Sequence, residues 1–292
     1  MEVRDLHPYG VAVHGLDPAQ LDRSRVEIAR LLREHGLLVF EGTPFSASQQ
    51  IELVSFVGTV LDEGMQGAFH GHIRHDPQVA SPIAAEGVFV GPLSFHSDLT
   101  YTTAPPEVLS LHALELPTNG SETRFANGAR ALASLPPHLR EQIADLEARH
   151  VFDASIDEYG GRYREAALGS RYFAAQHPVV RRNPRTGRDV LFVNELLTDR
   201  IVDLDDATSE ELLRSLFQCL YDDDCVYVHR WKPDDLVVWE NHEVQHARPA
   251  FDRSQRRVLR RVIAGDVTAN ARHGVEFHAQ MQRLPGDGPV LV

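Results

Sequence analysis

The chain has 292 residues, of which 42% are hydrophobic and 24% are charged, ordinary values for a globular protein. This length fits one large β-barrel or sandwich domain with helical additions. Since no repeat or linker divides the sequence, we expect a single domain over residues 1–292 with a core at about 11–266. The formal net charge of −13 argues against nucleic acid as a partner, because its phosphate backbone requires a basic surface.

The sequence also lacks the signals of membrane insertion and secretion. No stretch approaches the run of roughly 20 apolar residues that spans a bilayer. The N-terminus, MEVRDLHPYG, does not show the basic-then-apolar pattern of a signal peptide. Cys219 and Cys225 are the only cysteines, and two cysteines near a predicted helix end do not make a disulfide framework. These features predict a protein of the reducing cytoplasm that does not associate with a membrane.

The N-terminal part is predicted to contain two helices around one short strand. A helical pattern opens at Asp17-Pro18 and ends near Gly36, since glycine commonly follows a helix end. A buried strand is expected at 37–40, and a second helix at 46–60. The following stretch, 61–92, is rich in Gly and His, which predicts a long loop with one strand at 88–90.

Most of the remaining chain is predicted to be strands. A helix over 127–143, interrupted by two prolines, and an amphipathic helix over 209–221 are the exceptions, and 153–176 is polar and irregular. Strands are expected at 108–116, 177–182, 189–194, 226–231, 236–240 and 257–264. The chain therefore reads as mainly β with flanking α. This pattern favours a double-stranded β-helix (a cupin-like jelly roll) with N-terminal and inserted helices.

His96 and Asp98 form an H-x-D pattern. On a strand, residues at i and i+2 point to the same face, so both side chains could reach one ion. An imidazole and a carboxylate suit non-haem iron(II) when a second histidine completes one face of its coordination octahedron. The ordinary alternative is a hydrogen bond between the two side chains, because so short a pattern often occurs by chance.

A second segment completes the pattern. The run from Trp239 to Asn241 is followed by His246, and Arg257 and Arg261 stand 11 and 15 positions after that histidine. Together with the H-x-D, this arrangement resembles the taurine dioxygenase and 2,4-dichlorophenoxyacetate dioxygenase (TauD/TfdA) family of Fe(II)/2-oxoglutarate oxygenases. The resemblance runs, with interruptions, from about Val11 to Asp266.

The resemblance implies a role for each matching residue. His96, Asp98 and His246 would bind iron(II) and act as the catalytic centre. Thr123 falls in a segment similar to the family's G-G-D-T turn and would bind 2-oxoglutarate. Arg257 would bind the distal carboxylate of 2-oxoglutarate, for which a planar, always charged guanidinium is suited. With O₂ as the second co-substrate, the resemblance implies a dioxygenase that oxidises, chiefly by hydroxylation, a C–H bond of a small substrate and releases succinate and CO₂.

Arg261 is the residue from which the chemical class of the substrate can be predicted. If the strand alternates, Arg261 faces the barrel interior with Arg257, and an interior arginine without a partner would be costly. Its partner is either an acidic group of the substrate or a protein carboxylate, and the sequence leaves both open. Further candidate substrate contacts are Tyr101, Leu197 and His70. The segments at about 61–92 and 153–176 correspond to lid-like regions.

Several alternatives remain open from the sequence. The chain could be a metal-binding jelly roll without oxygenase activity, such as a sensor, or a metal-dependent hydrolase. Within the family it could be a desaturase or another oxidative tailoring enzyme of natural-product biosynthesis. Taurine itself is disfavoured, because Pro92 stands where taurine dioxygenase has an asparagine near the substrate and Leu197 replaces an aromatic residue. The resembling enzymes are commonly dimers or larger, which leaves a homo-oligomer open.

Overall fold

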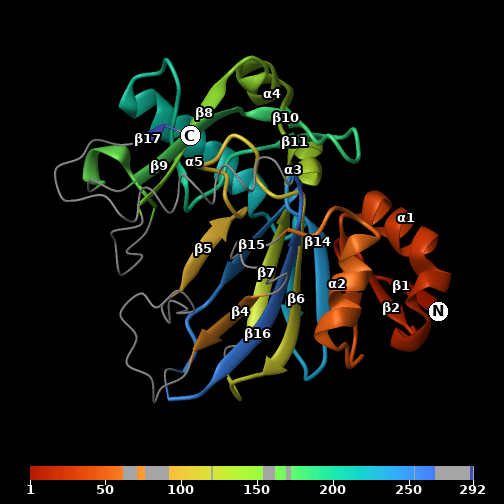
Figure 1. Cartoon of the computed structure of the whole chain (residues 1–292). Helices are drawn as coiled ribbons and strands as arrows, with labels where there is room; N and C mark the ends of the chain where they lie inside the picture. Colours follow the sequence, from red (N-terminus) through yellow and green to blue (C-terminus); the bar gives the residue numbers. More distant parts are fainter. Residues whose placement is uncertain are drawn as a thin grey trace.

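The computed structural model describes residues 1–61, 71–75, 92–119, 121–153, 162–168, 172–252, 254–266 and 290–291, with only the backbone described for 71–75 and 290–291. The described part is a strand-rich mixed α/β structure built around two facing sheets, with helices on one flank and across one end (Figure 1).

A seven-stranded sheet forms one wall. Its strand order is β1-β2-β3-β14-β6-β16-β4. In chain order these strands are β1 (Glu2–Asp5), β2 (Val11–His14), β3 (Leu37–Phe40), β4 (Gly71–His75), β6 (Val108–Glu115), β14 (Leu236–Glu240) and β16 (Arg257–Ala264). Only β2 and β3 pair in parallel; the other neighbours are antiparallel.

A four-stranded antiparallel sheet faces this wall. Its order is β13-β7-β15-β5, with β5 (Leu93–His96), β7 (Glu122–Asn127), β13 (Val226–Arg230) and β15 (Val244–Arg248). The core between the sheets is apolar: Trp239 of β14 meets Phe125 of β7 edge-on, with ring centroids 5.2 Å apart. Burial of such large aromatic side chains stabilises the sandwich and sets the spacing of its two walls.

Two helices cover the outer face of the large sheet, next to β1 and β2 in Figure 1. A 3₁₀ turn, η1 (Pro18–Ser24), leads into α1 (Arg25–His35), and α2 (Ala47–Ser55) follows β3. Gly36 ends α1 with φ of 72°, a left-handed conformation that glycine adopts without strain. Ser46 and Gln49 form a reciprocal capping box at the start of α2.

The remaining elements gather at one end of the sandwich, at the top of Figure 1. The apolar face of α5, including Leu213 and Leu216, packs there into a separate buried cluster. The helical elements are α3 (Gly128–Ser134), α4 (Pro137–Ile143), η2 (Glu165–Ala167) and α5 (Asp206–Leu220). The strands are β8 (Glu147–Asp153), β9 (Tyr172–Pro178), β10 (Val180–Arg182), β11 (Asp189–Leu191), β12 (Thr198–Ile201) and β17 (Val290–Leu291).

Many of the predicted elements are confirmed. The strands at 37–40, 108–116, 226–231, 236–240 and 257–264 match β3, β6, β13, β14 and β16 to within one residue. The break expected at the two prolines in 127–143 separates α3 from α4. Cys219 and Cys225 are free thiols. No helix in the described residues is long and apolar enough to cross a membrane.

Other predictions were wrong. The helix predicted over 46–60 ends at Ser55, just before Gly58, a poor helix former. The predicted loop at 61–92 contains β4, which forms by long-range pairing with β16 that no local pattern reveals. The segment 153–176, read as irregular, includes η2 and the start of β9. The strand expected at 88–90, most of the lid-like segment at 61–92, and residues 154–161 and 169–171 of the other lid-like segment lie outside the described residues.

Candidate metal centre

Three side chains meet beside β5 and β15. His96 ends β5, His246 lies opposite it in β15 as its direct cross-strand partner, and their ring centroids are 4.2 Å apart. Asp98 Oδ1 lies 3.4 Å from His96 Nε2 and 3.7 Å from His246 Nε2. The three ligand atoms lie within 4.8 Å of one another, and within the described ranges no other group of three or more His, Cys, Asp or Glu could hold a metal ion.

The position of Asp98 differs from the prediction. β5 ends at His96, so Asp98 lies in the turn that follows, where Leu99 has φ of 59°. Asn241 takes the place of a paired strand: its Oδ1 accepts the Asp98 N–H (2.9 Å), and its Nδ2 donates to Asp98 O (3.1 Å) and Pro106 O (2.9 Å). Asn241 is fully buried. A side-chain amide, rather than strand alternation, therefore fixes this carboxylate.

The ligand atoms of Asp98 and His246 are in the ionisation state that a divalent metal requires. His96 Nδ1 donates to Ser94 O (2.9 Å), so the other ring nitrogen, Nε2, is the one directed at Asp98 and His246. Burial, with the charge of His96, lowers the pKa of His246 to about 3, so this imidazole is neutral at neutral pH. Burial raises the pKa of Asp98, but His96, His246 and Arg261 outweigh it and hold that pKa well below its ordinary value. A carboxylate and a neutral imidazole fit a metal site.

Arg261 has a protein partner in this structure. Its Nη1 donates to Asp98 Oδ2 at 3.1 Å, while the side chain remains 32% exposed. The protein carboxylate, one of the two partners considered from the sequence, is thus present. Arg261 thus contacts Oδ2 of Asp98, while Oδ1 is the oxygen nearest to the two histidines.

A buried positive charge lies further along β16. Arg257 is only 3% exposed, and burial together with neighbouring Arg248 lowers its pKa to about 9. Among the described residues, no carboxylate lies within ion-pair distance of Arg257; its guanidinium instead faces the Phe251 ring at 5.7 Å. A buried arginine in such surroundings is stabilised by an anion. Leu259, between Arg257 and Arg261, packs in the interior core, which agrees with the expected alternation.

Thr123 lies on β7 and is 2% exposed. It shares a face of that strand with Phe125, which packs between the two sheets. Phe125 is also the cross-strand neighbour of His246. The Thr123 hydroxyl therefore points into the sandwich interior, two residues along the strand from the level of the triad.

Sequence reasoning missed two nearby groups. Arg248 is buried, has its pKa lowered to about 10 by burial, and places its guanidinium 4.8 Å from the Phe251 ring. A period-two pattern starting from His246 could have indicated it. Trp231 donates its indole Nε1–H to Thr123 Oγ1 at 2.8 Å. Nothing in the local sequence indicates that pair, because the two residues are 108 positions apart.

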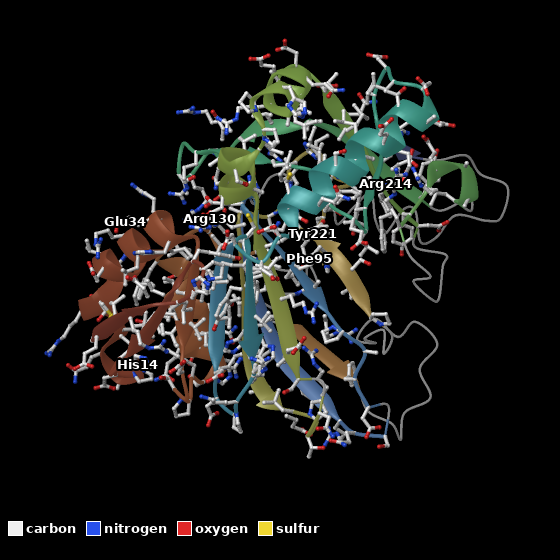
Figure 2. The ribbon with its side chains drawn as sticks, turned by 180° about the vertical axis from the view of Figure 1, so that it is seen from behind. His14, Glu34, Phe95, Arg130, Arg214 and Tyr221 are labelled. Carbon is white, nitrogen blue, oxygen red and sulfur yellow. The ribbon has the colours of Figure 1, made fainter. Side chains whose placement is uncertain are left out.

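Tyr221 contacts the residues that directly precede both candidate histidine ligands. Figure 2 shows Phe95 and Tyr221 side by side, stacked with ring centroids 4.3 Å apart. The Tyr221 hydroxyl donates to Gln245 Oε1 (3.0 Å). Since Phe95 and Gln245 directly precede His96 and His246 in the chain, Tyr221 anchors both strands next to the candidate ligands.

The other candidate substrate contacts lie apart from these polar groups. Tyr101 and Leu197 are buried in an apolar cluster beside the turn that follows Asp98. Tyr101 stacks on Phe152, with ring centroids 4.6 Å apart. His70 lies outside the described residues.

Comparison with known proteins defines the class. The model of the family described as "Taurine catabolism dioxygenase TauD, TfdA family" matches residues 2–263. Pentalenolactone F synthase of Streptomyces avermitilis is 32% identical over 278 residues, covering 87% of this chain and 90% of that protein. The α-ketoglutarate-dependent 2,4-dichlorophenoxyacetate dioxygenase of Cupriavidus pinatubonensis is 30% identical over 279 residues, covering 89% and 96%. The protein is an α-ketoglutarate-dependent dioxygenase, α-ketoglutarate being another name for 2-oxoglutarate. It belongs to the TauD/TfdA family.

Solved structures show the same fold. A taurine dioxygenase from Burkholderia xenovorans superposes with a TM-score of 0.73 at 21% identity, covering 90% of each chain. AAD-2 in complex with Mn(II) and N-oxalylglycine gives a TM-score of 0.72 at 22% identity, covering 91% of this chain and 97% of that one. The arrangement of elements is thus that of the taurine dioxygenase fold.

Proposed function

We propose that this dioxygenase holds iron(II) with His96, Asp98 and His246 and holds 2-oxoglutarate with Thr123 and Arg257. In this proposal it oxidises, chiefly by hydroxylation, a C–H bond of a small anionic substrate and releases succinate and CO₂. The observation that carries the proposal is the combination of two imidazoles and a carboxylate with a buried arginine that has no carboxylate nearby in the described residues.

The residue types support iron as the metal. Two histidines and one carboxylate on one side of an ion, with other positions open, are the arrangement of non-haem iron(II) oxygenases. Bound there, iron(II) with O₂ supplies the oxidising chemistry, coupled to loss of CO₂ from 2-oxoglutarate. The protein orients the ligands: Asn241 holds the main chain of Asp98, and Arg261 donates to its carboxylate oxygen Oδ2.

The co-substrate needs a partner for its distal carboxylate. The guanidinium of Arg257 can donate two parallel hydrogen bonds to a carboxylate, and its burial strengthens that attraction because water does not screen it. The Thr123 hydroxyl can donate a further hydrogen bond. The charge of a bound carboxylate would also favour protonated Arg257, whose pKa is otherwise lowered by burial.

Arg261 supports an anionic substrate. Because the side chain is 32% exposed, the guanidinium can meet an acidic group from outside while Nη1 keeps its bond to Asp98. Tyr101 and Leu197 would supply an apolar wall, with His70 as a further contact. The 2,4-dichlorophenoxyacetate relative, whose named substrate is an acid, agrees with this proposal.

A second candidate is oxidative tailoring of a natural product, including desaturation. The observation that favours it is the 32% identity with pentalenolactone F synthase over most of both chains. Both candidates use the same iron and 2-oxoglutarate sites. We further propose a single domain over residues 1–292, with a double-stranded β-helix core at about 11–266. The segment 2–263 that matches the family model covers nearly all of this core. We also propose that the protein is located in the cytoplasm.

Succinate formation tests the function. The protein with iron(II), ascorbate, O₂ and 2-oxoglutarate is offered a panel of sulfonates, aryloxyalkanoates, amino-acid-like acids and terpenoid lactones. We expect substrate-dependent succinate with at least one member and none from His246→Ala. Full turnover by His246→Ala would refute the site. The proposed role of Arg261 in binding an acidic group of the substrate is tested by comparing acids with neutral analogues. It would be wrong if the two turned over equally well in the wild type and also in Arg261→Gln.

A further inference from the structure

We propose that Trp231 is a positioning residue for 2-oxoglutarate: its indole N–H fixes the direction in which the Thr123 hydroxyl donates. This inference rests on the proposed role of Thr123 at the co-substrate and adds a residue that the sequence pattern did not indicate. It follows from the donor and acceptor capacity of two buried side chains.

The hydrogen bond between these residues has only one polarity. Trp231 Nε1 lies 2.8 Å from Thr123 Oγ1, and the residues are 4% and 2% exposed. An indole nitrogen can only donate, so Thr123 Oγ1 is the acceptor. The hydroxyl proton of Thr123 must then point to a different acceptor. A carboxylate can only accept hydrogen bonds. The Thr123 hydroxyl, whose oxygen already accepts from Trp231, is therefore left with its proton free to donate to a carboxylate of 2-oxoglutarate.

Trp231 is itself held in place. The His229 ring meets the indole edge-on, at 88° with ring centroids 4.6 Å apart, and the backbone N–H of Trp231 donates to Ser121 O (3.2 Å). His229 Nε2 in turn lies 3.2 Å from Oδ2 of Asp235, which is 1% exposed. This support keeps the indole N–H directed at Thr123, so the hydroxyl is oriented before 2-oxoglutarate arrives. Such preorganisation removes an ordering cost from binding.

The strand pairing explains why Trp231 can reach this position. His229 on β13 is the cross-strand partner of Thr123 on β7. Trp231 follows two residues later, directly after β13 ends, and its side chain can fold back over the interior face. It packs in the same core cluster as Phe125 and Leu259, the residues that mark the interior side of β7 and β16.

The experiment measures binding of 2-oxoglutarate to the metal-loaded protein without O₂, by absorption and by calorimetry. Trp231→Phe keeps a ring but removes the N–H. Thr123→Val removes the hydroxyl, and the double variant combines both. The matched control is Tyr9→Phe, because Tyr9 is a buried aromatic residue of the same core cluster and its hydroxyl has no hydrogen-bond partner in the described residues.

We expect Trp231→Phe to raise the Kd for 2-oxoglutarate about fivefold to tenfold, the size of one neutral hydrogen bond. The Kd for the metal alone should not change. Trp231→Phe should add little in the Thr123→Val background, and Tyr9→Phe should leave the Kd for 2-oxoglutarate within about twofold. A wild-type Kd in Trp231→Phe, or an equal effect with and without the Thr123 hydroxyl, would overturn the inference. Wild-type protein that binds no 2-oxoglutarate would instead refute the proposed function.

A second measurement does not depend on the folding of Trp231→Phe. In wild-type protein loaded with zinc, the two indole N–H groups give two NMR signals, which Trp239→Phe assigns. Addition of 2-oxoglutarate should shift the Trp231 signal, since its acceptor gains a new partner, and the shift should vanish in Thr123→Val. A Trp231 signal that stays in place while 2-oxoglutarate binds would contradict the inference.

Discussion

At the scale of single residues, the position of Asp98 depends on main-chain hydrogen bonds that a side chain, that of Asn241, supplies. Sequence reasoning selected His96 and Asp98 because alternate strand residues share a face. The structure does bring them together, but β5 stops at His96 and Asn241 supplies the hydrogen bonds that a strand partner would give. That His96 and Asp98 lie close together was predictable from their spacing. The means of holding Asp98 was not, because Asn241 lies 143 positions away.

Replacement of Asn241 should therefore weaken metal binding. Asn241→Ala removes two hydrogen bonds to Asp98 and one to Pro106. Loss of a residue that orients a metal ligand commonly costs about 10- to 100-fold in affinity. We expect a rise of at least about tenfold in the Kd for Mn(II), measured by electron paramagnetic resonance. Asn183→Ala is the control, since this fully buried asparagine accepts an N–H in the β10–β11 turn. Unchanged Mn(II) affinity in Asn241→Ala would refute this role.

At the scale of elements, α5 reaches the site through the residue after its last turn. Tyr221 stacks on Phe95 and donates to Gln245, so it fixes the two strands that carry the candidate histidines. The sequence predicted α5 as an amphipathic helix, which explains its buried leucines. It could not predict this contact, because the helix and both strands come from separate parts of the chain.

Tyr221→Phe tests this support. The stack on Phe95 should remain, while Gln245 Oε1 loses its donor and the Glu195 N–H loses its acceptor. We therefore expect kcat to fall by about threefold to tenfold. Tyr221→Ala should cost more, since it also removes the stack. Tyr172→Phe, which loses a tyrosine bond to Glu165 (3.1 Å), serves as the control. Equal kcat in wild type and Tyr221→Phe, measured as succinate release, would contradict the proposal.

At the scale of the whole molecule, the sequence predicted a strand-rich fold with flanking helices, but it did not predict all of the individual strands. The apolar runs of β3, β6 and β14 were read correctly because buried strands are strongly apolar. The strands that were missed are β1, β2, β4, β7, β8, β12, β15 and β17. β15 shows why: its sequence, VQHAR, is polar enough to read as a loop, because two of its positions serve the site rather than the core. Function therefore obscures the strand signal nearest the site.

Buried histidines link the stability of the whole molecule to pH. His177 contacts the carbonyls of Thr100 and Thr102, each at 2.9 Å, and burial lowers its pKa to about 4. Burial lowers the pKa of His242, which contacts Pro105 O at 3.0 Å, to about 4 as well. Unfolded histidines titrate near about 6.5. The unfolded chain thus binds more protons between these values, so the free energy of unfolding falls as pH drops from about 6.5 to 4.

His177→Gln should reduce this dependence. From the two pKa values, His177 accounts for about 2 kcal/mol of the stability lost between pH 7 and pH 5. Glu240, whose pKa burial raises to about 7, acts in the opposite direction in both proteins and cancels in the comparison. Urea unfolding at the two pH values measures the difference. An equal loss in wild type and His177→Gln would show that this histidine is not kept neutral by burial.

The central claim is that the three ligands and Arg257 form one site for iron(II) and 2-oxoglutarate. Its most direct test is the visible absorption of the protein with both added in the absence of O₂. We expect a weak charge-transfer band that needs both components, is lost in His246→Ala, and needs more 2-oxoglutarate to appear in Arg257→Gln. No band in the wild type, or an undiminished band in His246→Ala, would contradict the account.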